Sequence, residues 1–162
     1  MNAPGRSYWR LTKGDLKELK DLAYKEHREF FKRNPHLKAS FHNSLIGICL
    51  CQGAASHYLN SAIGIKDFDI WHFYRENKNS RFPYRAHKSI EKGYKKRRID
   101  FLKRAIPQHI CRLSPSEPSR IILNYLCQED NRTKKELLKK AIIGLWPSDI
   151  FGHILWRGKQ TN

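Results

Sequence analysis

The first third of the chain repeats apolar side chains with the period of an amphipathic helix. Within residues 12–33 the apolar positions recur three or four residues apart, at Leu16, Leu19, Leu22, Ala23 and Phe30. This spacing places them on one face of a helix. Thr12 followed by Asp15 predicts a capping box at its start, and Asn34-Pro35 predicts its end.

Three later segments have the composition or the alternation of strands. Residues 44–53, SLIGICLCQG, predict a buried strand that runs into a glycine turn and then a short helix over 53–60. Residues 65–74, IKDFDIWHFY, alternate partly with a period of two, which is typical of a strand. Residues 97–106, RRIDFLKRAI, resume a strand pattern that stops at Pro107.

The remainder of the chain, residues 109–162, is predicted to be helical. The spacing of a capping box occurs twice, over residues 114–117 and 133–136. Periodic apolar runs follow at Ile121, Ile122, Tyr125, Leu126, Leu137, Leu138, Ala141, Ile142 and Leu145. A final short helix is expected from Ser148.

These elements predict an α/β (α+β) fold, in which a mixed sheet is flanked by helices. We expect residues 1–108 to form the core, with residues 75–98 as a basic insertion. Residues 109–162 are expected to be a C-terminal helical extension packed on the same core. The length of 162 residues suits one domain, and a hydrophobic content of 40% excludes a wholly disordered chain.

The chain is strongly basic, with 32 lysines and arginines against 15 acidic residues and a formal net charge of +17. This charge exceeds what solubility requires and predicts a polyanionic partner. Nucleic acid or nucleotide phosphate is favoured over a membrane, because the chain has no apolar run of about 18 residues. The first residues contain no apolar signal core, and the four cysteines lack zinc-ligand spacing. We therefore expect a cytoplasmic protein with reduced thiols.

Much of the positive charge is concentrated in residues 75–98, which contain ten lysines and arginines and two glutamates. Pro83 and Gly93 in this segment predict a surface excursion rather than a core element. Aromatic residues lie among the basic ones, a mixture suited to phosphate neutralisation and base stacking. The predicted nucleic-acid contacts are Arg81, Arg85, Lys88, Lys95, Lys96, Arg97 and Arg98. The alternative is a solvated loop anchored by its aromatic side chains.

Three aspartates are the strongest chemical signal in the sequence. Asp67 and Asp69 lie two residues apart on a predicted strand, so both side chains point to one face. Asp100, in the next predicted strand, adds a third carboxylate if the two strands pair. Such a cluster is the usual oxygen-ligand set for Mg²⁺ or Mn²⁺ in phosphoryl chemistry. The alternative is that the Asp-x-Asp pair caps backbone amides or pairs with arginines.

The order of these features resembles the nucleotidyltransferase superfamily typified by DNA polymerase beta. That family has a strand, then Gly-Ser or Gly-Gly at the start of a helix, then Asp-x-Asp or Asp-x-Glu, and a third carboxylate on a following strand. Here Gly53-Ala54 opens the helix, twelve residues intervene, and Asp67-Phe68-Asp69 follows, with Asp100 in Ile-Asp-Phe-Leu. The resemblance covers residues 40–106 and implies a nucleotidyltransferase-like sheet.

The resemblance also implies roles for individual residues. Asp67 and Asp69 would bind metal ions and triphosphate, and Asp100 would complete the site that activates the attacking hydroxyl. The implied nucleotide-binding residues are Gly53, Ala54, Ser56 and Lys66. Ala54 departs from the family, because it stands where a serine or glycine is usual.

The first functional hypothesis is a metal-dependent transfer of a nucleoside monophosphate from a triphosphate to a hydroxyl acceptor, with nucleic acid as the favoured acceptor. The second is a nucleic-acid-binding or regulatory protein that keeps this fold without turnover. The third is a Mg²⁺-dependent nuclease, since Asp67, Asp100 and Lys103 also match a nuclease-like set. A regulatory protein partner is compatible with each hypothesis. His57, His72, Trp71 and Trp146 are predicted to be structural.

Overall fold

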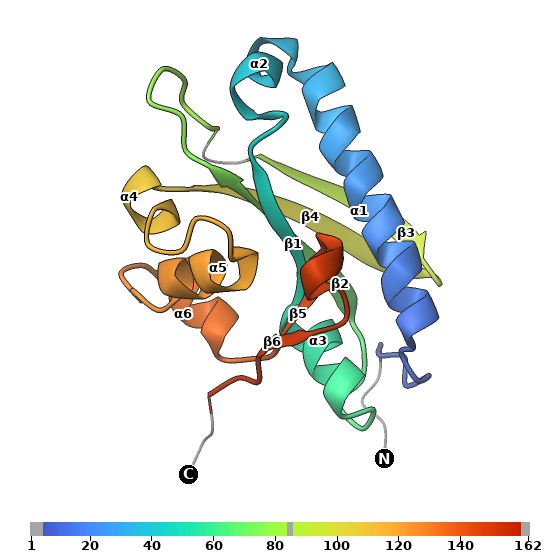
Figure 1. Ribbon diagram of the computed structural model, residues 1–162. Helices are drawn as coiled ribbons and strands as arrows, with labels where there is room; N and C mark the ends of the chain where they lie inside the picture. Colours follow the sequence, from blue (N-terminus) through green and yellow to red (C-terminus); the bar gives the residue numbers. More distant parts are fainter. Residues whose placement is uncertain (1–4, 84–85, 160–162) are drawn as a thin grey trace.

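A computed structural model describes residues 5–83 and 86–159, and within them six strands form one mixed sheet (Figure 1). The strands are β1 (Leu45–Cys51), β2 (Asp67–Arg75), β3 (His87–Tyr94), β4 (Arg97–Ile106), β5 (Ile142–Trp146) and β6 (Ile154–Trp156). Their order across the sheet is β3-β4-β2-β1-β5-β6. β2 and β4 are parallel and the other neighbouring pairs are antiparallel. The predicted α/β class with a mixed sheet is confirmed.

Helices cover both faces of the sheet (Figure 1). They are α1 (Lys13–Arg33), α2 (Lys38–Phe41), α3 (Gln52–Leu59), α4 (Gln108–Cys111), α5 (Pro118–Leu126) and α6 (Arg132–Leu138), with 3₁₀ turns at Pro35–Leu37 and Ser148–Ile150. The predicted capping box of α1 is confirmed: Thr12 Oγ1 accepts from the Asp15 amide, and Asp15 Oδ2 accepts from the Thr12 amide. No helix in the described part of the chain combines the length and apolar character needed to cross a bilayer.

Alternating side chains of the sheet contribute to apolar clusters on both of its faces. On β2, Phe68 and Ile70 pack with α1 and α3, whereas Trp71 and Phe73 belong to the cluster under α5 and α6. Successive residues of a strand point to opposite faces, so a central strand needs apolar residues on both. Asp67 and Asp69 lie on the same face as Trp71, the face covered by α5 and α6.

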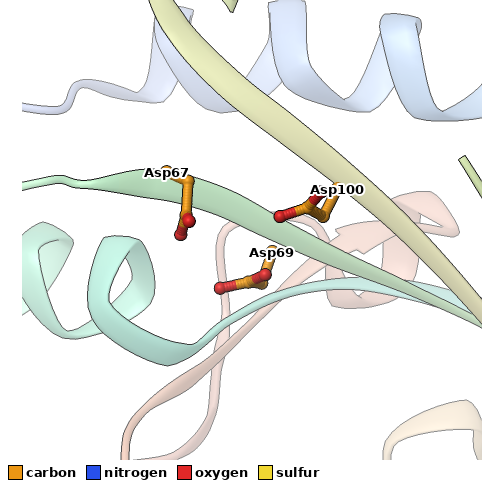
Figure 2. A group of neighbouring side chains, drawn as sticks. All are labelled: Asp67, Asp69 and Asp100. Atoms are coloured by element: carbon orange, nitrogen blue, oxygen red, sulfur yellow. The ribbon is translucent and has the colours of Figure 1, made fainter. Parts of the chain in front are cut away.

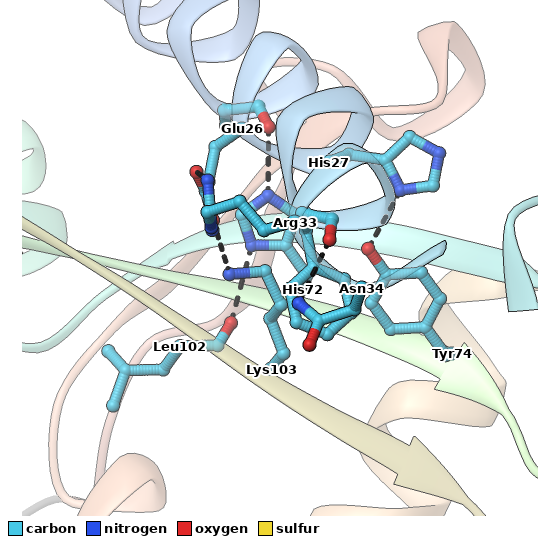
Figure 3. A network of polar contacts seen from close by, with 10 residues as sticks. Glu26, His27, Arg33, Asn34, His72, Tyr74, Leu102 and Lys103 are labelled. Atoms are coloured by element: carbon cyan, nitrogen blue, oxygen red, sulfur yellow. Dashed lines mark hydrogen bonds and ion pairs between the residues drawn. The ribbon is translucent and has the colours of Figure 1, made fainter. Parts of the chain in front are cut away.

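A polar network fixes α1 to the other face of the sheet (Figure 3). The Glu26 carboxylate accepts two hydrogen bonds from Arg33, at 3.1 and 2.7 Å, and one from Lys103 Nζ at 2.6 Å. Burial lowers the pKa of Lys103 even though Glu26 favours its charged form. His72 is fully buried beside this pair, and burial lowers its pKa to about 3. The expected structural role of His72 therefore agrees with its position.

The prediction of a purely helical C-terminal segment is wrong. Residues 142–146 form β5, which lies between β1 and β6, and the helix expected from Ser148 is a single 3₁₀ turn followed by β6. The helical period in this run was misleading because β5 is buried on both faces, so its apolar side chains need no alternation. Both C-terminal capping boxes are also wrong: α5 begins at Pro118, and Asn131 caps α6.

The basic segment contributes a strand rather than a surface excursion. β3 forms one edge of the sheet, and its side chains are exposed from His87 through Lys92. Lys95 and Lys96 connect β3 to β4 with φ values of 45° and 67°, the left-handed pair typical of a type I′ hairpin turn. The polar, lysine-rich sequence hides this strand, because an edge strand has little apolar surface to bury.

Gly144 gives a direct test of the packing of β5. A Cβ atom at this position would lie 2.1 Å from the Ile150 carbonyl oxygen, and backbone atoms cannot move aside cheaply. We expect Gly144→Ala to lower the free energy of unfolding by about 3 kcal/mol. Urea unfolding followed by circular dichroism measures the change. Gly14→Ala is the matched control, because its Cβ meets only Thr12 Oγ1 at 3.5 Å; an equal loss in both variants would contradict the packing argument.

Candidate metal and nucleotide site

The three predicted carboxylates lie together on one face of the sheet (Figure 2). Asp67 and Asp69 come from the start of β2, and Asp100 lies directly opposite Asp69 in the parallel pairing with β4. One carboxylate oxygen from each residue lies within 4.8 Å of the others. This spacing lets all three groups contact one small cation.

Among the described residues, Arg98 and Ser89 donate hydrogen bonds to the cluster. Arg98 Nη2 donates to Asp67 Oδ2 at 2.9 Å, and Arg98 Nε donates to Asp100 Oδ2 at 3.2 Å. Ser89, on β3, donates its hydroxyl to Asp100 Oδ1 at 2.5 Å. Arg98 therefore neutralises part of the negative charge of the cluster, which agrees with the alternative that the Asp-x-Asp pair forms ion pairs with arginines. Its guanidinium points to the carboxylates and not outward to a ligand.

Asp69 is the most perturbed of the three carboxylates. Burial raises its pKa to about 7, with further contributions from the negative charges of Asp67 and Asp100, while Arg98 opposes the rise. A pKa raised this far means that the surroundings of Asp69 supply too little positive charge to stabilise its ionised carboxylate. A divalent ion at the cluster would supply that charge, and carboxylate oxygens are the ligands that Mg²⁺ and Mn²⁺ prefer.

A cavity of about 470 Å³ opens beside Asp67 and Asp69. Gly53 and Lys66, two of the predicted nucleotide-binding residues, line it. The lining also includes residues that carry no functional signal in the sequence: Arg6, Gln52, Trp71, Leu102, Arg132, Thr133, Glu136, Leu137 and Lys140. The cavity therefore has a polar rim with four basic side chains and an apolar part formed by the tryptophan and leucines. Trp71 was expected to belong to the core alone, and it contributes to both.

The junction of β1 and α3 forms one wall of this cavity. Gln52 has a φ of 60°, a left-handed conformation that costs a non-glycine residue on the order of 1 kcal/mol. Gly53 follows in an ordinary conformation, and a Cβ placed on it would meet no atom within 4 Å. The sharp turn therefore occurs at Gln52, whereas Gly53 leaves open space at the start of the helix.

The other two residues of the implied nucleotide site do not line the cavity. Ala54 is buried in the core. Ser56 Oγ accepts a hydrogen bond from the Ala141 amide at 3.2 Å, which ties α3 to the start of β5. Neither side chain is thus available to a ligand here. His57, predicted to be structural, lies between the Trp9 carbonyl and the Gly64 amide.

The predicted nucleic-acid contacts are divided among several environments. Arg97 donates to Ser7 Oγ and to the carbonyls of Gly5 and Lys66, and so holds the N-terminal segment. Lys95 pairs with Asp15 at 2.8 Å and lies over the Trp9 ring.

The rest of this set is spread around β3 and β4. Lys88 and Lys96 are exposed on the β3–β4 hairpin, and Arg98 contacts the carboxylates. Arg81 lines a separate surface hollow, and Arg85 lies outside the described residues. Among the described members of the set, Lys88 and Lys96 are therefore the two that are exposed on this hairpin without a role in holding another segment or the carboxylates.

Comparisons of the chain with protein-family models, curated proteins and solved structures find no match. The ligands that the site can bind are therefore inferred from its own residues and their geometry. Three carboxylates can hold a hard cation. Four basic side chains from separate segments can neutralise phosphate, and the apolar part of the cavity can accept a ring. This combination suits a metal-bound phosphorylated ligand.

Metal binding to the cluster can be measured through thermal stability. We expect Mg²⁺ or Mn²⁺ to raise the melting temperature of the wild-type protein, because a ligand that binds only the folded state stabilises it. Asp69→Asn should reduce this rise to near zero, whereas Asp149→Asn, which changes an exposed carboxylate distant in sequence, should retain it. Differential scanning fluorimetry in metal-free buffer with added ion gives both values. Equal responses in the two variants would exclude the cluster as the binding site.

The raised pKa of Asp69 predicts a pH dependence in the absence of metal. Between the usual aspartate pKa and about 7, the folded state holds a proton that the unfolded state has lost. The contribution of Asp69 to the free energy of unfolding is therefore greatest at acidic pH and declines as the pH rises from about 4 to about 7. Urea unfolding in chelator should show this decline for the wild type relative to Asp69→Asn. Parallel pH profiles would contradict the assigned environment.

Proposed function

We propose that this chain is a metal-dependent nucleotidyltransferase with the fold typified by DNA polymerase beta. It would move a nucleoside monophosphate from a nucleoside triphosphate to a hydroxyl acceptor. The observation that carries the proposal is the convergence of Asp67, Asp69 and Asp100 within 4.8 Å beside a basic-rimmed cavity. Metal-assisted transfer of a nucleotide needs such carboxylates and a place for phosphate.

The connectivity supports the same proposal. β1 leads into α3, whose first residues line the cavity, and β2 then carries both aspartates of the Asp-x-Asp pair. β4 returns parallel to β2 and brings Asp100 opposite Asp69. This is the order of elements that the resemblance in the sequence implied.

Each group at the site has a definite task under this proposal. Asp67 and Asp69 would hold Mg²⁺ or Mn²⁺, which would neutralise charge on the phosphates and lower the pKa of the attacking hydroxyl. Lys66, Arg132 and Lys140 would bind the triphosphate in the cavity. Asp100 would accept the proton of the acceptor hydroxyl as that oxygen attacks the α-phosphorus, and pyrophosphate would leave in line.

The basic surface favours a nucleic-acid acceptor. Lys88 and Lys96 project from the β3–β4 hairpin, the hairpin that also carries Ser89 and Arg98 next to the carboxylates. With a net charge of +17 for the chain, a nucleic-acid backbone would be attracted to this edge of the sheet. Such binding would weaken as the salt concentration rises.

The position of Lys103 argues against the nuclease hypothesis, which needs this lysine beside Asp67 and Asp100. Lys103 has a fully buried side chain, and its ammonium pairs with Glu26 on the opposite face of the sheet from Asp67 and Asp100. It cannot reach a scissile phosphate without breaking that ion pair. The remaining alternative, a binding protein without turnover, is separated from the transferase by the experiment below.

Incubation with each α-³²P-labelled nucleoside triphosphate, Mg²⁺ or Mn²⁺, and mixed RNA and DNA tests the function. We expect label to enter an acceptor, and we expect Asp67→Asn and Asp100→Asn each to lower the initial rate by at least about 10²-fold, since each removes a charge used in the transition state. The control Asp149→Asn should retain the wild-type rate. Binding of triphosphate without label transfer would favour the non-catalytic alternative, and strand cleavage would favour a nuclease.

A further inference from the structure

A serine hydroxyl lies against Asp100, the residue proposed to accept the proton of the acceptor hydroxyl. Ser89 on β3 is the register partner of Asp100 on β4, and Asp100 is the register partner of Asp69 on β2. Partners in adjacent strands point to the same face and are about 5 Å apart. Ser89, Asp100 and Asp69 therefore form one row across three strands, with the serine hydroxyl 2.5 Å from Asp100 Oδ1.

The hydrogen-bond partners fix the direction of the serine proton. Ser89 has one hydroxyl hydrogen, and it donates this hydrogen to Asp100 Oδ1. His87 Nε2 lies 3.1 Å from the same Ser89 oxygen. It must donate to that oxygen, because no second serine hydrogen exists. Asp100 is thus the base available to Ser89, and His87 orients the hydroxyl without accepting its proton.

The position of Ser89 relative to the cavity suits an in-line attack. Across the sheet the order is β3, β4, β2, β1, so Ser89 lies on one side of the carboxylates and the start of α3 lies on the other. A triphosphate whose β- and γ-phosphates lie beside Gly53 and Lys66 in the cavity would have its leaving pyrophosphate on the side away from Ser89. Ser89 is exposed on an edge strand, so a nucleotide can approach it from solvent.

We infer that Ser89 is itself a nucleotide acceptor, and that the chain attaches a nucleoside monophosphate to its own Ser89. This inference rests on the proposed nucleotidyl transfer. The Ser89 O–H bond breaks and its proton passes to Asp100, while a bond forms between Oγ and the α-phosphorus. The bond from the α-phosphorus to the bridging oxygen breaks, and that oxygen keeps the electron pair as pyrophosphate departs. The products are a phosphodiester on Ser89 and pyrophosphate, with no oxidant or further reactant.

One physical feature favours Ser89 over other hydroxyls of the chain. Its hydroxyl is held against the base in the resting structure, so the reaction within one chain avoids the entropy loss of bringing an acceptor to the site. The modification would also prevent further nucleotide transfer at this site. A phosphodiester on Ser89 has no hydroxyl hydrogen to donate to Asp100, and the attached nucleotide would occupy the place of an external acceptor.

The test uses the full chain, Mn²⁺ and each α-³²P-labelled nucleoside triphosphate in turn, with no added acceptor. We expect one label per chain at most, which tandem mass spectrometry should locate on Ser89. Ser89→Ala removes the acceptor oxygen and should abolish labelling at this position, and Asp100→Asn should lower labelling by at least about 10²-fold, the usual contribution of a general base being of this order. Ser89→Thr keeps a hydroxyl and should still be labelled. Ser116→Ala, which removes an exposed serine in the loop before α5, should be labelled like the wild type.

The same preparations separate this inference from the proposed function. In a mixture of wild-type and Asp69→Asn chains, reaction within one chain labels only the wild type, at a rate per chain that is independent of concentration. Label that enters added RNA or DNA but never Ser89 would overturn the inference and leave the transferase intact. Label on another residue of the chain would also overturn it. Absence of label transfer to any acceptor would overturn both.

Discussion

Parallel pairing of β2 with β4 is the constraint on which the candidate site depends. A parallel ladder fixes which residues of two strands lie side by side, and here it places Asp69 opposite Asp100 and Asp67 opposite Arg98. If β2 or β4 shifted by one residue along the ladder, the side chains of that strand would point to the other face of the sheet. The apolar residues between them, Phe68 and its neighbours, prevent that shift, because they are buried in the core under α1.

The two faces of the sheet separate two kinds of buried charge. Under α1, Glu26 is satisfied by Arg33 and Lys103, and this closed network fixes the helix on the sheet. On the other face, the carboxylates have only partial compensation from Arg98, and burial raises the pKa of Asp69 to about 7. Charge that is fully paired inside the fold serves structure, whereas charge left short of a partner beside a cavity is suited to bind an ion.

The C-terminal segment makes the cavity as well as completing the sheet. β5 lies against β1 in the sheet, and the turn before it brings α6 over the face that carries the aspartates. Arg132 is the first residue of that helix, Lys140 follows its end, and both line the cavity. Two of the basic residues that line the cavity thus come from a part of the chain far from the aspartates in sequence. The β3–β4 hairpin lies on the other side of the carboxylates, where Ser89 donates to Asp100 and His87 Nε2 lies 3.1 Å from the Ser89 oxygen.

The sequence by itself determined the elements whose signals are local: the long helix with its capping box at Thr12, the buried strand β1, and the Asp-x-Asp pair of β2. It also indicated Asp100 as a third carboxylate of the cluster, on the condition that its strand pairs with the strand of Asp67 and Asp69, and the pairing of β2 with β4 meets that condition. It did not reveal β3, an edge strand whose side chains are mostly exposed, or β5, which is buried on both faces and therefore has no alternation of apolar and polar residues. Only the tertiary structure decided that Arg98 pairs with the aspartates, that Ser56 binds backbone, and that α6 faces the site, because these contacts depend on strand order and helix placement that no local pattern encodes.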